Sequence, residues 1–216
     1  MAILVVCGVR ADGYREVLAI EPMPEESTES YSELFGKLKE RGLSGVRLVV
    51  SDAHRGLIHA IERGFPGACW QRCKVHFMRN ILAHVPKRDQ KTFAGLLKLI
   101  WQSPNRQAAK KQAEEITQRY GEKYPKAIEV LEEGLEDSLI FFDFPSLDSR
   151  KIRSNNMIER LNQEIRRRTK VIGIFPNPES YIRLVTIYLM EYSEDWSVSK
   201  TYLSRASIAE SPKLAA

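Results

Sequence analysis

Three polar residues at helical spacing, Glu159, Asn162 and Arg166, carry groups that could do chemistry at one site. Offsets of three and four residues place them in one line along a helix, because an α-helix has 3.6 residues per turn. A carboxylate in such a line can hold a hard divalent cation, and a guanidinium can bind a phosphate. A structural alternative stays open for Glu159, since Asn156-x-x-Glu159 also matches a capping box.

The helix that carries these residues is predicted to start at Asn155 or Asn156, where a short polar side chain can cap the first turn. Its buried face follows a spacing of about four and contains Met157, Ile158, Leu161 and Ile165. Its end is basic, where the helix dipole favours cations, and contains Arg166, Arg167, Arg168 and Lys170. These cations could contact phosphates, or they could form an ordinary solvated face.

Asp52 is a second carboxylate in a position that suits chemistry. It follows the apolar run at residues 46–50, which is typical of a buried strand. Sheets in α/β proteins place ligands at the carboxyl ends of their strands. The alternative is that Asp52 caps the helix that follows it.

The segment from Cys69 to His76 contains three side chains that could bind a metal ion. The spacing is Cys69-x3-Cys73-x2-His76, and no fourth ligand at a standard zinc spacing is evident. The alternative is a buried cysteine and a packed histidine at the end of a strand.

The composition of the 216 residues indicates an ordinary soluble protein, with 43% hydrophobic and 28% charged residues. The net charge of +5 weakly favours a polyanionic partner. Three cysteines are too few for a secreted disulfide scaffold, and no apolar run reaches the length of a membrane span. We therefore expect a cytoplasmic protein with no membrane partner and no small-molecule substrate.

The chain order predicts an α/β fold with a mixed sheet. We expect strands at 3–9, 14–20, 46–50 and 69–72, with a D-G hairpin turn at Asp12-Gly13 and a loop at 21–26. Helices are expected from Ser27 or Thr28 to Gly42, after Asp52, and at 90–101, 105–120, 125–141, 155–170 and from Pro178. The tail at 205–216 is expected to fray.

Three separated blocks resemble the mutator-type family of bacterial insertion-sequence transposases. They are LVVSDAHRGL from Leu48, CWQRCKVHFMRNILAHVPK from Cys69 and SNNMIERLNQEIRRRTKVIGIFPN from Ser154. The resemblance implies a ribonuclease-H-like fold with a helical insertion before the last catalytic helix. The implied regions are 1–75 and 150–205 for the catalytic domain, 76–149 for the insertion and 206–216 for a tail.

The resemblance also implies the site residues. Asp52 and Glu159 match two members of an Asp, Asp, Glu triad that holds metal ions, and Cys73 and His76 match a Cys-x2-His signature beside it. Two Mg²⁺ or Mn²⁺ ions are expected, because they can activate both oxygens of an in-line displacement at phosphorus. Asn162, Arg166, Arg167, Arg168 and Lys170 are the expected DNA contacts.

The resemblance places the first triad Asp ahead of Ile3, and no residue before Asp52 matches it. Asp12 is the only aspartate there, and turn chemistry accounts for it. We therefore expect an N-terminally truncated member of the family, whose sheet lacks its first strand. Such a fragment would pair Leu4–Val9 directly with Val46–Val50, or it would be unstable.

The predicted function is that of a transposase or a C-terminal fragment of one. Metal-dependent cleavage and strand transfer at the ends of an insertion sequence would be its reaction. DNA would be the partner, and a homo-oligomer is expected for the intact enzyme. The alternative is a catalytically inactive remnant that acts at most as a DNA-binding or subunit-interaction module.

Overall fold

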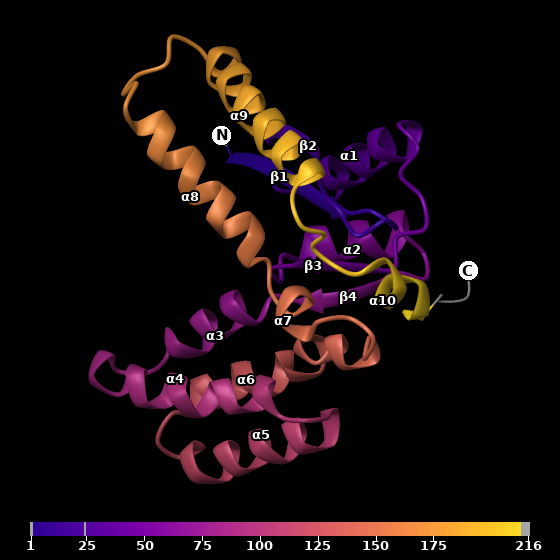
Figure 1. The fold of residues 1–216 in the computed structure, drawn as a ribbon. Coiled ribbons are helices and arrows are strands. Elements are labelled where there is room, and N and C mark those ends of the chain that lie inside the picture. The colour runs from indigo at the N-terminus through magenta and orange to yellow at the C-terminus, as the bar shows by residue number, and fades with distance from the viewer. Residues whose placement is uncertain (1, 24, 213–216) are drawn as a thin grey trace. The chain divides into compact units, whose positions relative to one another are not determined.

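A computed structural model describes residues 2–23 and 25–212 and divides the chain into two compact units. The first unit contains the segments 2–46, 55–67 and 156–212, without residue 24, and the second contains 47–54 and 68–155. Each unit mixes two strands with several helices, so the chain is a mixed α/β protein, as predicted (Figure 1). None of the described helices is both long and apolar enough to span a membrane. The predicted domain boundaries at residues 75 and 149 stay a prediction.

The first unit begins with an antiparallel hairpin of β1 (Ala2–Val9) and β2 (Arg15–Met23). Asp12 belongs to the turn, as expected, because its carboxylate accepts hydrogen bonds from Arg10 and from the backbone N–H of Tyr14. Gly13 has a φ of +92°, and a Cβ there would collide with the carbonyl oxygen of Leu203. This position therefore requires glycine.

Two helices of the same unit follow the predicted caps. The Ser27 hydroxyl accepts from the N–H of Ser30 at the start of α1 (Thr28–Glu40), and Gly42 follows with a φ of +99°. The inner face of α1 buries Tyr31, Leu34, Phe35 and Leu38. The second helix, α2 (Arg55–Gly64), packs close to α1, because the Gly64 position lies under the Phe35 ring.

The last helices of the first unit are α8 (Asn156–Lys170), α9 (Pro178–Val198) and α10 (Arg205–Glu210). A buried cluster joins α8 and α9 to the hairpin and contains Val5, Leu161, Ile165, Val185 and Leu189. Helix α9 also contacts β2, since the N–H of Val17 donates to Ser193 Oγ over 3.4 Å. The Arg15 guanidinium lies 4.5 Å from the Trp196 ring.

The second unit contains two parallel strands, β3 (Leu48–Ser51) and β4 (Cys69–Arg72), in which Leu48 lies opposite Cys69. Its helices are α3 (Lys74–Leu82), α4 (Lys87–Gln102), α5 (Arg106–Tyr120), α6 (Pro125–Ser138), η1 (Ile140–Asp143) and α7 (Ser149–Ile152). The buried Gln71 ties β4 to this helical block. Its amide donates to the carbonyl of Ser138 over 3.0 Å and accepts from the N–H of Phe141 over 2.7 Å.

Three expectations about the elements are wrong. Leu4–Val9 does not pair with Val46–Val50, because β1 and β2 form one two-stranded sheet and β3 and β4 form another. The predicted loop at 21–26 is strand as far as Met23, since the hairpin pairing continues there, with Pro22 opposite Ile3. The tail is helical at 205–210, where the Ser204 hydroxyl caps the first turn. Residues 24 and 213–216 lie outside the described residues.

Candidate nucleic-acid interface

Helix α8 buries one apolar face, and a line of predicted site residues runs along one edge of that face. Leu161 and Ile165 are buried in the unit core, and Thr169 donates its hydroxyl hydrogen to the Ile165 carbonyl over 2.9 Å. The line of Glu159, Asn162, Arg166 and Lys170 flanks this buried face. With a rise of about 1.5 Å per residue, Arg166 and Lys170 lie about 10 and 16 Å along the axis from Glu159. This line thus places one carboxylate and two cations along a single helix side.

The four cations at the end of α8 are not equivalent. The Glu164 carboxylate accepts hydrogen bonds from both Arg167 and Arg168, and these bonds lower the pKa of Glu164 to about 2. Arg168 also lies 4.4 Å from the Tyr188 ring centroid and 3.8 Å from Glu191. In the described part of the chain, the exposed Arg166 and Lys170 form no ion pair.

This difference separates the predicted DNA contacts into two pairs. No carboxylate among the described residues pairs with Arg166 or Lys170, whereas the charge of Arg167 and Arg168 is partly offset by Glu164. The sequence analysis missed Glu164, although its spacing was a usable signal. A glutamate three and four residues before two arginines forms helical ion pairs.

Asp52 lies at the carboxyl end of β3 in the second unit, as predicted, and its side chain is exposed. The residue before it is firmly held. The Ser51 hydroxyl accepts from the Trp70 indole over 2.8 Å, and the Ser51 carbonyl accepts from the N–H of Cys73 over 2.7 Å. Helix α2 begins at Arg55, so Asp52 is not in the capping position that the alternative required.

Cys73 lies between the two segments that lead to the predicted carboxylates. Its side chain is fully buried, and its thiol donates to the amide oxygen of Asn155 over 2.7 Å. Asn155 directly precedes α8, where the sequence suggested that its side chain could cap the helix. In the structure this side chain bonds Cys73. Through its own N–H, Cys73 also holds Ser51, the neighbour of Asp52. Cys73 therefore connects the end of β3 with Asn155, within the second unit.

The possible metal ligands do not form a complete set. Within residues 2–23 and 25–212, no group of three His, Cys, Asp or Glu side chains is arranged to hold a metal ion. This result includes Cys69, Cys73 and His76, the zinc ligands considered above. The predicted roles of Asp52, Glu159, Cys73 and His76 in catalysis stay predictions.

Lys74 is an unusual cation at the start of α3. Burial lowers its pKa to about 8, and the nearby positive charges of Arg153 and Lys98 act in the same direction. Its N–H donates to the carbonyl of Arg153 over 3.1 Å. The half-buried ammonium therefore loses its proton more easily than an ordinary lysine.

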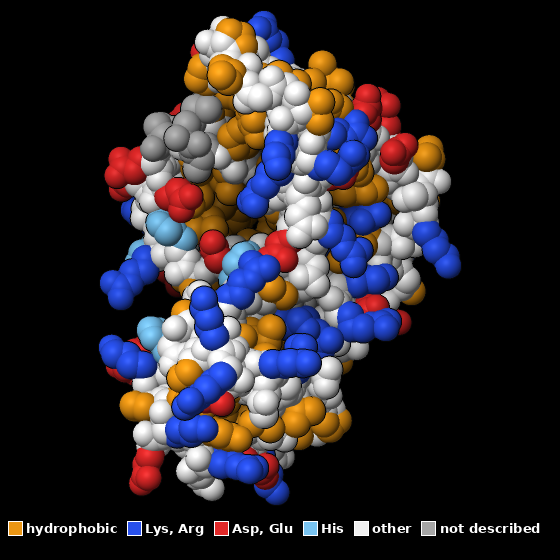
Figure 2. Space-filling view, turned by 90° about the vertical axis from the view of Figure 1, so that its left-hand side faces the viewer, with side chains coloured by type: hydrophobic (Ala, Val, Ile, Leu, Met, Phe, Trp, Pro, Cys, Tyr) orange, Lys and Arg blue, Asp and Glu red, His pale blue; other side chains and the backbone are white. Residues whose placement is uncertain are grey.

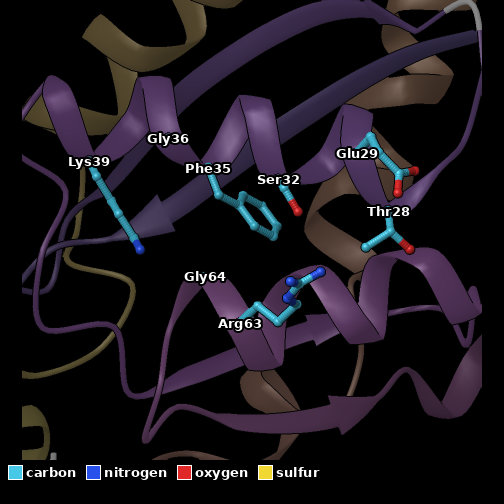
Figure 3. Close-up of a pocket in the computed structure, with 8 residues that line it drawn as sticks. All are labelled: Thr28, Glu29, Ser32, Phe35, Gly36, Lys39, Arg63 and Gly64. Atoms are coloured by element: carbon cyan, nitrogen blue, oxygen red, sulfur yellow. The ribbon is translucent and has the colours of Figure 1, made fainter.

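A hollow of about 390 Å³ lies between α1 and α2 of the first unit. Figure 3 shows Arg63 extending from α2 toward Ser32 and Glu29 of α1, with Lys39 farther along the same helix. None of the predicted catalytic or DNA-contacting residues lines this hollow. The hollow and the line of polar residues on α8 therefore share no residue.

Comparison with known proteins identifies the family. The family described as "Transposase, Mutator family" matches residues 1–199. The chain is 39% identical over 214 residues to the transposase for insertion sequence element ISRM5 of Rhizobium meliloti (strain 1021), which covers 99% of this chain and 54% of that protein.

Two further relatives give the same result. The transposase for IS1081 of Mycobacterium tuberculosis (strain ATCC 25618 / H37Rv) is 42% identical over 200 residues, 93% of this chain and 48% of that protein. The transposase for IS256 in transposon Tn4001 of Staphylococcus aureus is 40% identical over 197 residues, 90% of this chain and 50% of that protein. The chain spans about half the length of these curated relatives, and it belongs to the Mutator family of transposases.

Proposed function

We propose that this chain acts in DNA transposition as part of an insertion-sequence transposase, and that α8 binds the DNA backbone through Arg166 and Lys170. The observation that carries this proposal is the pair of exposed cations, without ion pairs in their unit, on the same helix side as Glu159. Phosphate contacts of this kind position DNA without reading its sequence. The names of the relatives favour a transposase over the inactive module considered as the alternative.

The proposed reaction is cleavage and strand transfer at the ends of an insertion sequence. Asp52 and Glu159 are the proposed carboxylate ligands of Mg²⁺ or Mn²⁺, since these cations prefer oxygen donors. The type of donor fits the metal, since Mg²⁺ is usually bound through one or two carboxylates together with substrate phosphates. We therefore assign these two residues to metal binding by donor type.

Three finer features belong to the same proposal. A ribonuclease-H-like fold would explain why a hairpin, a helix and the strand ending at Asp52 precede a long helical block and the Glu159 helix. A DNA substrate in the cell would place the protein in the cytoplasm. Several copies would assemble on the two ends of one element.

Binding of a fluorescein-labelled duplex of about 30 base pairs, followed by anisotropy, tests the proposal. Binding should weaken steeply as salt rises from 50 to 200 mM, since phosphate contacts release counterions. The Glu159→Gln variant should bind at least as tightly as the unmodified chain, because it removes a negative charge from the helix side that carries Arg166 and Lys170. Absence of binding at 50 mM salt would refute the proposal.

A further inference from the structure

The turn between α8 and α9 exposes an apolar surface that none of the described residues of its unit covers. Val171 and Ile174 are 86% and 90% exposed, and Ile172 between them is 49% exposed. Large apolar side chains of this exposure are usually isolated on a soluble protein, whereas these three occupy four consecutive positions. We call residues 171–174 the apolar turn. Figure 1 shows it joining the ends of α8 and α9, which run in opposite directions.

The apolar turn has a defined conformation. The N–H of Ile172 donates to the Thr169 carbonyl over 3.2 Å, and the N–H of Ile174 donates to the Ile172 carbonyl over 3.0 Å. Gly173 has a φ of +76°, which reverses the chain direction. Just beyond the turn, the Phe175 ring packs edge-on against Tyr181 with centroids 5.0 Å apart. Bonds and packing at both ends thus hold the exposed side chains outward.

The surroundings of the apolar turn are basic. Residues 164–191 contain five cations, Arg166, Arg167, Arg168, Lys170 and Arg183, and three acidic residues, Glu164, Glu179 and Glu191. Glu164 pairs with Arg167 and Arg168, and Glu191 pairs with Arg168. Figure 2 shows hydrophobic side chains next to Lys and Arg side chains at the top of the molecule, where Figure 1 places this turn. A second copy of this chain is disfavoured as the partner, because the excess positive charge around two such turns would make them repel each other.

Duplex DNA matches both properties of this surface. Its phosphates attract the cations, and its stacked bases accept apolar wedges, for which DNA-bending proteins use side chains such as isoleucine and leucine. β-Branched side chains have few rotamers, so Val171 and Ile174 lose little freedom on insertion. We propose that Val171 and Ile174 insert between base steps of the bound duplex and kink it. This inference rests on the proposed function, since the DNA is the same.

The experiment uses a duplex of about 30 base pairs with a donor and an acceptor dye at its two ends. At saturating protein, the unmodified chain should raise the energy transfer, because a wedge kinks DNA by about 20–90°. The Val171→Ser/Ile174→Ser variant should lose at least half of this rise while its affinity by anisotropy falls by less than about threefold. A matched control, Ile187→Ser/Met190→Ser, changes two exposed apolar residues of α9 and should keep the rise.

The outcomes separate the two proposals. An equal rise in energy transfer for the 171/174 variant would overturn the wedge and leave the proposed function intact. Absence of DNA binding by the unmodified chain would overturn both. Sedimentation provides the third outcome, since a change from dimer to monomer in the 171/174 variant, with the kink retained, would make the apolar turn a protein interface. All four side chains are exposed, so folding should survive, and thermal melts should agree among the three proteins.

Discussion

Replacing Cys73 by alanine should destabilise the second unit, because the thiol joins two segments that are far apart in sequence. The substitution removes the hydrogen bond to Asn155, which spans 2.7 Å, and leaves the amide oxygen without that donor. Losing one partner of a part-buried hydrogen bond costs about 1 kcal/mol. Removing the fully buried sulfur costs about another 1 kcal/mol in lost burial and cavity formation. The expected total is about 2 kcal/mol.

Urea unfolding and thermal melts measure this loss. For a chain of this length, about 2 kcal/mol corresponds to a Tm lower by about 4–8 °C. Cys73→Ser should lose less, because serine keeps a donor for Asn155. Cys69→Ala is the matched control in the same unit, since the Cys69 thiol is partly exposed and forms no hydrogen bond among the described residues. It should change the free energy of unfolding by less than about 0.5 kcal/mol.

A double-mutant cycle isolates the hydrogen bond itself. Cys73→Ala and Asn155→Ala should be non-additive, with a coupling of about 1 kcal/mol, because each removes the same hydrogen bond. Additive effects, or a Cys73→Ala protein as stable as the Cys69→Ala control, would refute the assignment of Cys73 as the connection between β3 and Asn155. The salt dependence of DNA binding should not change, since the Cys73 side chain is fully buried and carries no positive charge.

Three further predictions concern packing, pH and charge. Gly134→Ala in α6 should lower the free energy of urea unfolding by about 1–2 kcal/mol, because the new Cβ would collide with Arg72 and lie 2.7 Å from Phe77. Gly95→Ala in α4 is the matched control: its Cβ meets no neighbour, and it should raise the free energy of unfolding by about 1 kcal/mol. Folding lowers the pKa of Lys74, so the unfolded chain binds more protons than the folded chain between pH 8 and 10.5. The free energy of unfolding should therefore rise with pH over this range, and thermal melts of Lys74→Met should show a flatter rise. Glu164→Gln should free Arg167 and Arg168 from their ion pairs. The salt slope of DNA binding should then steepen by about 0.9 for each additional phosphate that these arginines neutralise. An unchanged slope would contradict the claim that Glu164 keeps the two arginines from the DNA.

Local signals in the sequence were sufficient for most helices. Asn105 and Asn177 cap α5 and α9 through hydrogen bonds to the N–H groups of Ala108 and Ser180, as short polar side chains before an amphipathic segment predict. Pro125 occupies the first turn of α6, where its missing N–H costs nothing. These features depend on neighbours three or four residues away, so the printed sequence contains them.

Long-range features were not predictable in the same way. The pairing of β1 with a distant strand failed, because an apolar run indicates a strand but not its partner. Asn155 suggested a helix cap, but its side chain bonds a thiol 82 positions earlier. The distinction among the four cations of α8 was an intermediate case. Helical spacing alone would have assigned Arg167 and Arg168 to Glu164, and the structure adds that Arg166 and Lys170 stay exposed.

The salt dependence of DNA binding in two double variants tests the central claim, that the Arg166–Lys170 side of α8 contacts the DNA backbone. The slope of log affinity against log salt falls by about 0.9 for each phosphate that the protein no longer neutralises. Arg166→Gln/Lys170→Gln should therefore reduce the slope by about 1.8. Arg167→Gln/Arg168→Gln removes the same formal charge but should change the slope much less, because Glu164 already binds both arginines. Equal reductions in the two variants, or a larger reduction in the second, would contradict the account.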